Sequence, residues 1–451
     1  MSSLKEAWSF KIRGEAASGV SAIGSLAASP IVKGGVVYLQ DLYANVYAIA
    51  LSTGRLIWEY RVNSPLTISL GPDGVAVDGR RVYGDSPTSV FALNATTGKV
   101  LWVDRRLLGS GQGTFGIQPQ VADGQVYLAS ALGSGPHGGI LLALNATNGK
   151  VLWRFNTLAQ THDGVYASGG AWETPLVGDD GSVTFGTGNP YQSINSVIEH
   201  PTSLAYTDSD VNLNAATGKL RWYYQGVPDD FKDYDMQLSP VAAIVNGTPV
   251  VIGGGKMGFV YAINAETGAL LWETPVGQHN GHDQDSLLAL EGKSTLQAPF
   301  TYLPGSLGGV LNDLAVDRTS VYVATVDLPF QVTSLDQTPG VNVGTPAHSM
   351  ATGEVEALNL ETGAVEWDTK FSQMPLGGTT VSNDLVFTTL YDGVLVALNR
   401  STGAVVYRHR LPTSTNSTIA VAGNTVLVPA GGPKTKSGGG GHPQLLAYTL
   451  S

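Results

Sequence analysis

The segment YAINAETGALLW (261–272) is one of seven closely similar stretches that recur along the chain. The other six are AIALSTGRLIW (48–58), FALNATTGKVLW (91–102), LALNATNGKVLW (142–153), VNLNAATGKLRW (211–222), EALNLETGAVEW (356–367) and VALNRSTGAVVY (396–407). Each stretch ends in an aromatic residue, which is tryptophan in all but the last. A repeat at intervals of about 40–50 residues is typical of a β-propeller, in which each unit forms one four-stranded blade.

Each copy of the repeat predicts a strand, a turn and a second strand. Runs such as GVVYLQD (35–41) and SVYVATV (320–326) alternate in hydrophobicity and are rich in β-branched and aromatic residues, as strands are. The Asn and Gly of the N-A-x-T-G stretch favour a turn because both tolerate positive φ. The closing tryptophan then lies on the strand after the turn.

The two ends of the chain together supply an eighth copy. EAWSFKI (6–12) resembles the end of a repeat, and LLAYTLS (445–451) resembles its first half. This arrangement predicts a ring closed by pairing of the N- and C-terminal strands, which removes the open sheet edges. We therefore predict an all-β fold, an eight-bladed β-propeller formed by residues 1–451 as a single domain, with insertions before Trp222 and Trp367.

Composition excludes several functional classes. The formal net charge is −11 and basic residues form no run, so nucleic acids and anionic membrane surfaces are poor partners. Apolar runs are all much shorter than the roughly 20 residues that span a bilayer. The first residues, MSSLKEAW (1–8), lack the apolar segment of a signal peptide. The chain has no cysteine, which excludes disulfides and thiolate metal ligands.

An acidic run follows the fourth full repeat, in WYYQGVPDDFKDYDMQLSP (222–240). It contains Asp229, Asp230, Asp233 and Asp235. In an extended segment alternate side chains point to the same side, so we expect Asp233 and Asp235 to lie together. Two carboxylates on one face repel each other unless a cation or proton lies between them, and hard cations prefer such oxygen ligands. The alternative interpretation is a solvated acidic loop.

Three further residues stand apart from the repeat. Trp172 in GGAWETP (169–175) is the one tryptophan outside the repeat register, and is either a core or rim aromatic or a platform for a planar cofactor. Asn189 in GTGNP (186–190) fits an ordinary turn. Lys256 in GGGKMGFVYAIN (253–264) fits a surface lysine, and the segment is not a phosphate-binding loop because it lacks the G-K-[ST] ending and precedes a strand.

A cluster of polar residues in HNGHDQD (279–285) also raises the question of a metal. Its two histidines do not have the spacing of a compact two-histidine motif. A polar loop at the rim is the favoured interpretation.

The A-L-N-A-x-T-G-x-x-x-W repeat resembles the tryptophan-docking motif of the eight-bladed quinoprotein alcohol dehydrogenase superfamily, and the similarity covers essentially the whole chain. The resemblance implies that pyrroloquinoline quinone stacks on Trp172. It implies that Asn189, Asp233 and Asp235 bind a Ca²⁺ or lanthanide ion, with Asp233 also acting as the general base. It places Lys256 beside the quinone carbonyl oxygens. Weaker candidates for contacts to the cofactor are Thr114, in GQGTFGIQP (111–119), and Asn312, in GSLGGVLNDLAVD (305–317).

The chain also departs from the pattern of that superfamily. The large enzymes place a metal-binding Glu in the third blade, where this chain has YLASALGSGPHGGILLALN (127–145), without Asp or Glu. Ser134 falls near the expected position. Either Asp235 or Glu173 compensates for the missing charge, or the site has lost its metal and its chemistry. An appended c-type haem is excluded because the chain has no cysteine.

The resemblance implies an enzyme that oxidises a small or polymeric alcohol by hydride transfer to the quinone. Its nearest relatives would be of the polyvinyl-alcohol dehydrogenase type, and an external acceptor such as a cytochrome would take the electrons. We expect a monomer. The superfamily implies a periplasmic or extracellular location, whereas the missing signal peptide leaves a cytoplasmic one open. Two alternatives remain: a non-catalytic binding or assembly scaffold, since such proteins share the repeat, and a hydrolase or lyase that uses the carboxylates without quinone.

Overall fold

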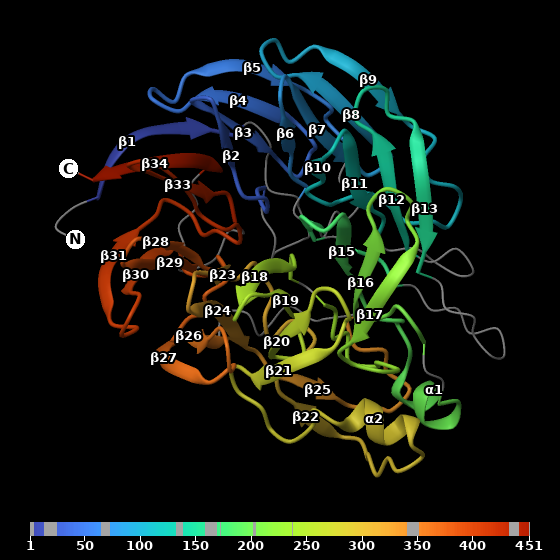
Figure 1. The fold of residues 1–451 in the computed structure, drawn as a ribbon. Coiled ribbons are helices and arrows are strands. Elements are labelled where there is room, and N and C mark those ends of the chain that lie inside the picture. Colours follow the sequence, from blue (N-terminus) through green and yellow to red (C-terminus); the bar gives the residue numbers. More distant parts are fainter. Residues whose placement is uncertain are drawn as a thin grey trace.

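The strands of the protein are arranged as blades around a ring (Figure 1). The computed structural model describes residues 4–12, 25–64, 73–131, 139–157, 169–171, 173–201, 204–236, 238–340, 351–432 and 442–450. Over these residues, the strands form eight four-stranded antiparallel sheets and one two-stranded sheet. The predicted all-β, eight-bladed propeller is therefore confirmed, with two short helices added.

The strand bounds follow the repeat closely. Blades in the first half are β2 (Ile31–Lys33), β3 (Val36–Gln40), β4 (Val46–Ala50) and β5 (Leu56–Tyr60); β6 (Ala76–Asp78), β7 (Arg81–Ser86), β8 (Ser89–Asn94) and β9 (Val100–Asp104); β10 (Gln120–Ala122), β11 (Gln125–Ala129), β12 (Ile140–Asn145) and β13 (Val151–Asn156); β14 (Leu176–Val177), β15 (Ser182–Gly186), β16 (Ser209–Asn214) and β17 (Leu220–Gln225). The remaining blades are β18 (Val241–Val245), β19 (Thr248–Gly254), β20 (Phe259–Asn264) and β21 (Leu270–Pro275); β23 (Ala315–Val316), β24 (Ser320–Asp327), β26 (Thr352–Asn359) and β27 (Val365–Phe371); β28 (Thr380–Ser382), β29 (Leu385–Leu390), β30 (Val394–Asn399) and β31 (Val405–Arg410); and β32 (Ala420–Ala422), β33 (Thr425–Ala430), β34 (Gln444–Leu450) and β1 (Leu4–Lys11).

The first and last strands belong to the same sheet. β1 pairs antiparallel with β34, with Lys11 opposite Gln444 and Lys5 opposite Thr449. The N- and C-termini accordingly lie close together at the left of Figure 1.

The turn of each repeat is built differently from the expectation. The glycine has positive φ, for example 68° at Gly98. The asparagine acts through its side chain: Oδ1 of Asn94 accepts hydrogen bonds from the backbone N–H groups of Thr96 and Thr97, each at 3.0 Å. Asparagine is therefore favoured here as an acceptor that closes the turn, and not for tolerance of positive φ.

The turn of one blade contacts the tryptophan of the preceding blade. The indole N–H of Trp58 donates to the carbonyl oxygen of Ala95 at 2.8 Å, and a Cβ added to Gly98 would lie 2.7 Å from the same ring. Equivalent indole donations join the other repeats: Trp8 to Leu51, Trp102 to Ala146, Trp153 to Ala215, Trp222 to Ala265, Trp272 to Leu360 and Trp367 to Arg400. Tryptophan and glycine thus contact each other at these seven junctions.

The elements outside the blades come from the two predicted insertions. The insertion before Trp222 contains α1 (Ile194–Glu199), and the insertion before Trp367 contains α2 (Asp285–Leu290), β22 (Phe300–Tyr302) and β25 (Phe330–Val332). α1 and α2 contact each other, and all four elements gather at one side of the ring (Figure 1). Among the described residues, neither helix is long and apolar enough to cross a membrane.

Candidate functional site

The backbone of Gly188 and Asn189, just after β15, contacts three other segments of the chain. The N–H of Gly188 donates to Gly170 O at 2.8 Å, and its carbonyl oxygen accepts from the N–H of Asp208 at 3.0 Å. The N–H of Asn189 donates to Oδ1 of Asp235 at 2.8 Å. Residues far apart in the sequence are therefore brought together, two of the segments by backbone–backbone hydrogen bonds and the third through the carboxylate of Asp235.

A buried lysine lies between the two carboxylates predicted to share one side. Nζ of Lys256 contacts Oδ2 of Asp233 at 2.9 Å and also forms an ion pair with Oδ2 of Asp235. The backbone N–H of Lys256 donates to Asp235 O at 3.0 Å. The same-side placement is confirmed, although Asp233 has φ of 65° and the segment is not a regular strand.

Burial excludes a solvated acidic loop and a surface lysine as interpretations of these residues. Asp229, Asp230, Asp233 and Asp235 are at most 5% exposed, so the acidic run is not a solvated loop. Lys256 is 7% exposed and is not a surface lysine. Charged side chains are rarely buried so deeply unless they are paired or bind ions.

The charges of the cluster shift one another's pKa values. Burial raises the pKa of Asp233 well above its usual range, and the Lys256 ammonium opposes that rise. Burial alone would lower the pKa of Lys256, but the adjacent Asp233 and Asp235 outweigh it and raise the pKa. Lys256 therefore stays protonated, whereas Asp233 is a more basic carboxylate than an exposed aspartate.

Asn189, whose backbone N–H binds Asp235, has a side-chain oxygen atom that is not used. Its side chain is 1% exposed, and Oδ1 has no hydrogen-bond partner among the described residues. A buried amide oxygen without a partner costs free energy, on the order of 1–3 kcal/mol. In the described part of the chain, no three Asp, Glu, His or Cys side chains form a group that could hold a metal ion. The donor set is instead the two carboxylates with the amide oxygen, all hard oxygen ligands.

Trp172 and Ser134 lie outside the described residues. The segment before Trp172 is fixed next to the site: Ala171 N–H donates to Ser130 O at 3.1 Å, and Oγ1 of Thr157 donates to Gly169 O at 2.7 Å. Glu173, the suggested substitute for the missing Glu, is partly buried.

The two weaker cofactor candidates have other partners. The backbone of Thr114 forms an isolated bridge with Ala131, with both N–H···O distances at 2.9 Å. The side-chain amide of Asn312 donates to the carbonyl oxygen of Leu376. Their cofactor contacts remain predictions.

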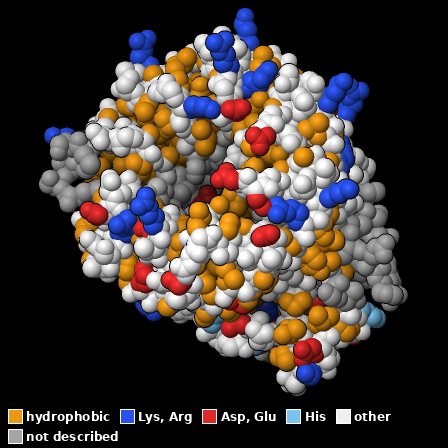
Figure 2. Space-filling model, in the orientation of Figure 1, with side chains coloured by type: hydrophobic (Ala, Val, Ile, Leu, Met, Phe, Trp, Pro, Cys, Tyr) orange, Lys and Arg blue, Asp and Glu red, His pale blue; other side chains and the backbone are white. Residues whose placement is uncertain are grey.

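Two residues that the sequence did not reveal lie near the carboxylates. Gly340 has φ of 85°, and a Cβ added to it would lie 2.5 Å from Oδ2 of Asp233. Burial is the largest cause of the raised pKa of the Tyr191 phenol, and the nearby charges of Asp235 and Asp233 raise this pKa further. Gly340 occurs in an ordinary T-P-G turn, which carries no signal for this approach. Figure 2, which views the ring from the same side as Figure 1, shows a hollow near the middle of the molecule with acidic side chains beside it.

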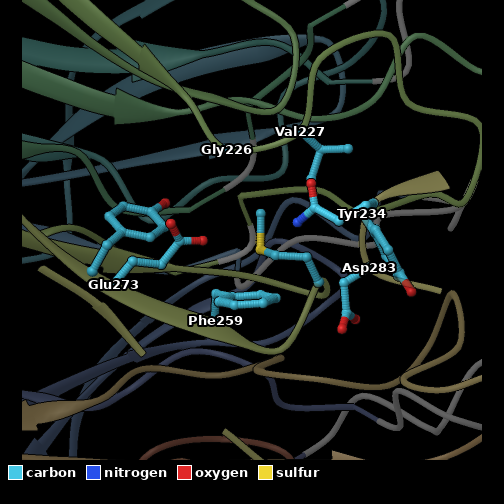
Figure 3. Close-up of a pocket in the computed structure, with 9 residues that line it drawn as sticks. Gly226, Val227, Tyr234, Phe259, Glu273 and Asp283 are labelled. Atoms are coloured by element: carbon cyan, nitrogen blue, oxygen red, sulfur yellow. The ribbon is translucent and has the colours of Figure 1, made fainter. Parts of the chain in front are cut away.

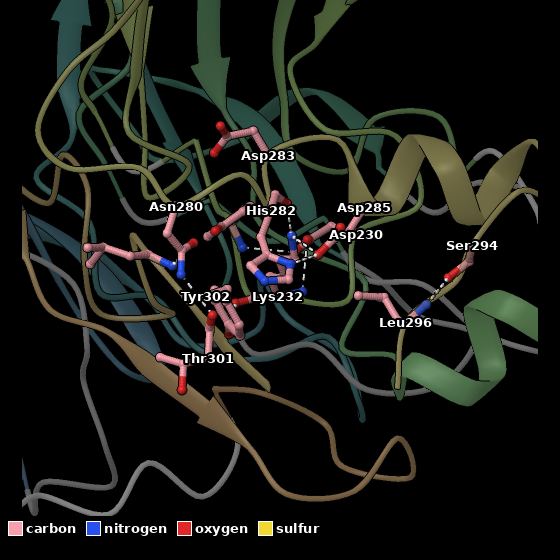
Figure 4. A network of polar contacts seen from close by, with 12 residues as sticks. Asp230, Lys232, Asn280, His282, Asp283, Asp285, Ser294, Leu296, Thr301 and Tyr302 are labelled. Atoms are coloured by element: carbon pink, nitrogen blue, oxygen red, sulfur yellow. Dashed lines mark hydrogen bonds and ion pairs between the residues drawn. The ribbon is translucent and has the colours of Figure 1, made fainter. Parts of the chain in front are cut away.

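A second buried lysine lies on the other side of the acidic run. Nζ of Lys232 is 2.9 Å from Oδ2 of Asp285 and also donates to the carbonyl oxygen of His282 (Figure 4). The rings of Phe231, Tyr234 and Tyr302 surround it, with centroids 5.5, 5.4 and 5.4 Å from Nζ. Burial lowers the pKa of Lys232, and the carboxylate of Asp285 opposes that shift.

The HNGHDQD loop is therefore not simply a polar rim loop. Its Asp285 is buried and holds Lys232, while Nδ1 of His282 lies 2.9 Å from the same carboxylate oxygen. The other pair is separate, with Nδ1 of His279 2.7 Å from Oδ1 of Asp283.

A small pocket lies beside the same insertion (Figure 3). Its lining comprises Gly226, Val227, Tyr234, Met257, Phe259, Tyr261, Glu273, Asp283 and Gln284. The lining contains the chain neighbours of Asp233 and Lys256 but neither of those residues, so this pocket is distinct from the carboxylate cluster.

Curated relatives of the chain are quinone-dependent alcohol dehydrogenases. The chain is 29% identical over 265 residues to the quinoprotein alcohol dehydrogenase PedH of Pseudomonas putida, a match that covers 51% of this chain and 43% of PedH. It is 24% identical over 475 residues to polyvinylalcohol dehydrogenase of Sphingopyxis sp., covering 90% of this chain and 62% of that protein. The chain thus matches less than half the length of PedH.

Solved structures confirm the fold. The quinohemoprotein alcohol dehydrogenase ADHIIG of Pseudomonas putida superposes with a TM-score of 0.80 at 20% identity, covering 99% of this chain and 76% of that one. A europium-containing methanol dehydrogenase superposes with a TM-score of 0.76 at 18% identity, covering 99% and 93%. At these identities the likeness shows the fold alone.

Two family models match different parts of the chain. Residues 351–447 match the model described as outer membrane protein assembly factor BamB. Residues 1–284, more than half of the chain, match the PQQ model described as glucose/ethanol/alcohol dehydrogenase, beta-propeller domain. The protein therefore belongs to this PQQ family of dehydrogenase β-propellers.

Proposed function

We propose that the protein is a quinoprotein dehydrogenase that oxidises an alcohol. The observation that carries the proposal is the buried group of Asp233, Asp235 and Lys256 beside the unpartnered amide oxygen of Asn189. Membership of the PQQ family supports the cofactor, and the curated relatives support the reaction class.

The residues fit the implied metal and cofactor. Asn189, Asp233 and Asp235 offer oxygen ligands only, which suits Ca²⁺ or a lanthanide ion. Lys256 offers a fixed positive charge for quinone oxygens, and Trp172 a flat surface for the quinone ring. When bound, pyrroloquinoline quinone supplies a hydride acceptor and the metal ion supplies Lewis acidity.

Asp233 is the proposed general base. Its raised pKa brings it closer to that of a substrate hydroxyl than an exposed aspartate would be, which favours proton transfer. The Lys256 ammonium, 2.9 Å from Oδ2, fixes the orientation of this carboxylate. Gly340 covers the carboxylate so closely that a side chain at this position would displace it.

The relatives of the chain support a proposal for its substrate, electron acceptor and location. We propose a small or polymeric alcohol as the substrate and an external acceptor, such as a cytochrome, for the electrons. A periplasmic location fits an enzyme of this kind. The name of the europium-containing methanol dehydrogenase makes a lanthanide a specific candidate beside Ca²⁺.

Reconstitution tests the proposal. Purified protein is incubated with pyrroloquinoline quinone plus Ca²⁺ or La³⁺, and tryptophan fluorescence quenching and dye-linked oxidation of an alcohol panel are measured. We expect quenching that is weakened in Trp172→Ala, and dye reduction with at least one alcohol. Quenching without dye reduction by either metal would leave a binding protein and not a dehydrogenase. The absence of both would contradict the proposal.

One observation favours a second function, that of a non-catalytic assembly scaffold. Residues 351–447 match the BamB family model, and scaffolds act through exposed surfaces without a cofactor. The same reconstitution separates the two, because a scaffold leaves the quinone unbound.

A further inference from the structure

Asp208 is a buried carboxylate that neither the repeat nor the proposed catalytic set accounts for. It is 0% exposed, and neither carboxylate oxygen has a hydrogen-bond partner among the described residues. An ionised carboxylate in such surroundings is strongly destabilised unless a cation or a proton compensates for its charge.

The backbone holds Asp208 at the proposed metal site. Its N–H donates to Gly188 O at 3.0 Å, and its carbonyl oxygen accepts from Gly226 N–H at 2.9 Å. The peptide group between Gly188 and Asn189 binds both aspartates. Its carbonyl oxygen accepts from the N–H of Asp208, and its N–H donates to the carboxylate of Asp235. Asp208 and Asp235 therefore flank Asn189 from two neighbouring segments. Asp208 also has φ of 45°, in the left-handed region that few non-glycine residues other than Asn, Asp and His adopt.

The charges near Asp208 are unbalanced. Besides burial, the carboxylates of Asp230, Asp235 and Asp233 raise its pKa, and Lys256 is the cation that opposes them. The ammonium of Lys256 is already shared by Asp233 and Asp235. With one lysine for three carboxylates, a proton or a bound cation must compensate for the remaining charge beside Asn189, whose side-chain oxygen has no partner.

We propose that Asp208 completes the cation site, as the carboxylate that, with Asp235 and the amide oxygen of Asn189, binds the metal ion and favours a trivalent over a divalent ion. This inference rests on the proposed function, because it deepens the assignment of the same site. Asp208 supplies the negative charge that a glutamate in the third blade was expected to supply. Coulombic attraction grows with the charge of the ion, so the extra carboxylate contributes half as much again for a trivalent ion as for a divalent one.

Asp210 provides a matched control. It lies two residues along in β16, is 1% exposed, and has an oxygen without a hydrogen-bond donor that packs against Gly253. Its pKa, about 7, is raised by burial and opposed by a hydrogen bond from Tyr261, with no contribution from the acidic run. Asp210→Asn therefore removes an equally buried carboxylate that does not face the site.

The experiment titrates the quinone-free full-length protein with Tb³⁺ and follows tryptophan-sensitised luminescence. Ca²⁺ affinity is measured by competition against Tb³⁺. If Asp208→Asn weakens Ca²⁺ binding about ten-fold, the charge ratio predicts about 30-fold for Tb³⁺, whereas Asp210→Asn leaves both affinities within about two-fold of wild type. Asp208→Ser, with circular dichroism of every variant, covers the case in which Asp208→Asn does not fold.

Each outcome decides the inference. A loss of Tb³⁺ affinity in the Asp208 variants that exceeds their loss of Ca²⁺ affinity supports it. Equal affinities in wild type and the Asp208 variants overturn it, as does a wild-type protein that binds neither ion. The proposed function is judged separately, by quinone quenching and dye reduction in the wild type. Metal binding that depends on Asp208 without dye reduction would retain this inference and reject the dehydrogenase.

Discussion

The two buried lysines beside the acidic run differ in what surrounds them. Lys256 lies between Asp233 and Asp235, and these carboxylates raise its pKa. Lys232 has Asp285 as its ion-pair partner and three aromatic rings around it, and burial lowers its pKa. The two ammonium groups are almost equally inaccessible to solvent, at 7% and 1% exposure.

The difference teaches how one short segment serves two purposes. Asp233 and Asp235 alternate with Lys232 and Tyr234, so one side of the segment carries the carboxylates and the other binds the insertion. The carboxylate side has two carboxylates for one lysine and lies beside Asn189, whose amide oxygen has no partner, so a bound ion can use these oxygens. The insertion side is neutralised by Asp285 and packed with rings, which stabilises the fold. We expect mutations on the two sides to separate activity from stability.

The largest expected effect is on the carboxylate side. Asp233→Asn removes the proposed base while keeping the shape of the side chain. We expect dye-linked alcohol oxidation by the reconstituted enzyme to fall about 10³-fold, within the range for loss of a general base. Quinone quenching and the melting temperature should change little. A variant that retains more than a tenth of the wild-type rate would contradict the assignment.

The next largest effect is on the insertion side. Lys232→Met leaves Asp285 buried without its lysine, which should lower the free energy of unfolding by about 3–5 kcal/mol. Urea denaturation measures this loss. The matched control is Lys293→Met, because Lys293 forms an exposed pair with Glu291, for which we expect a much smaller loss. Equal losses in both variants would show that the Lys232 pair contributes no more than a surface pair.

A smaller effect is expected from the glycine that covers Asp233. Gly340→Ala places a methyl group against the carboxylate, which must move, and we expect the oxidation rate to fall about ten-fold because misplacement of a catalytic group is costly. Gly292→Ala is the control: Gly292 has φ of 67° and open space around its Cβ position, so it shares the backbone strain without the contact. The two variants should lose similar stability but differ in rate. If their rates agree, Gly340 has only a conformational role.

The smallest effect concerns the histidine at the edge of the insertion. Burial lowers the pKa of His279, but the hydrogen bond and charge of Asp283 outweigh this and raise it. A raised histidine pKa stabilises the fold fully below the unfolded value of about 6.5, and this stabilisation is lost as the pH rises through the folded value. Asp283→Asn should therefore cost less than about 1 kcal/mol near pH 5.5 and almost nothing near pH 8.5. Melting temperatures at the two pH values test this, and a loss confined to pH 8.5 would reverse the sign.

The repeat made the fold predictable because its signals are local. Turn residues, alternation and a closing tryptophan all lie within about a dozen residues of one another, and their recurrence reports the number of blades. The site was predictable where it depended on the same local rules, as with Asp233 and Asp235 on one side of their segment. Lys256 and Asn189 were assigned through the family resemblance, and the structure places both at the carboxylates.

Contacts between distant segments were not predictable. Gly340 and Asp208 reach the site from an insertion loop and from the bend before β16, and nothing in their local sequence marks that approach. Asp285 was wrongly assigned to a polar rim loop because its partner, Lys232, is remote in sequence. The single domain of 1–451, the monomeric state and the roles of the site residues stay predictions.

The junction between tryptophan and turn has a consequence for unfolding. Each of the six copies that end in tryptophan contributes to two interfaces, because its turn accepts a hydrogen bond from the indole of the preceding blade and its own indole donates to the turn of the next. When a blade opens, the indole of the preceding blade loses its acceptor. The turn of the following blade loses its indole donor. Nearest-neighbour coupling of this kind makes loss of one blade promote loss of the adjacent ones. The ring should accordingly melt as a cooperative unit, and damage to a single repeat should be felt by three blades.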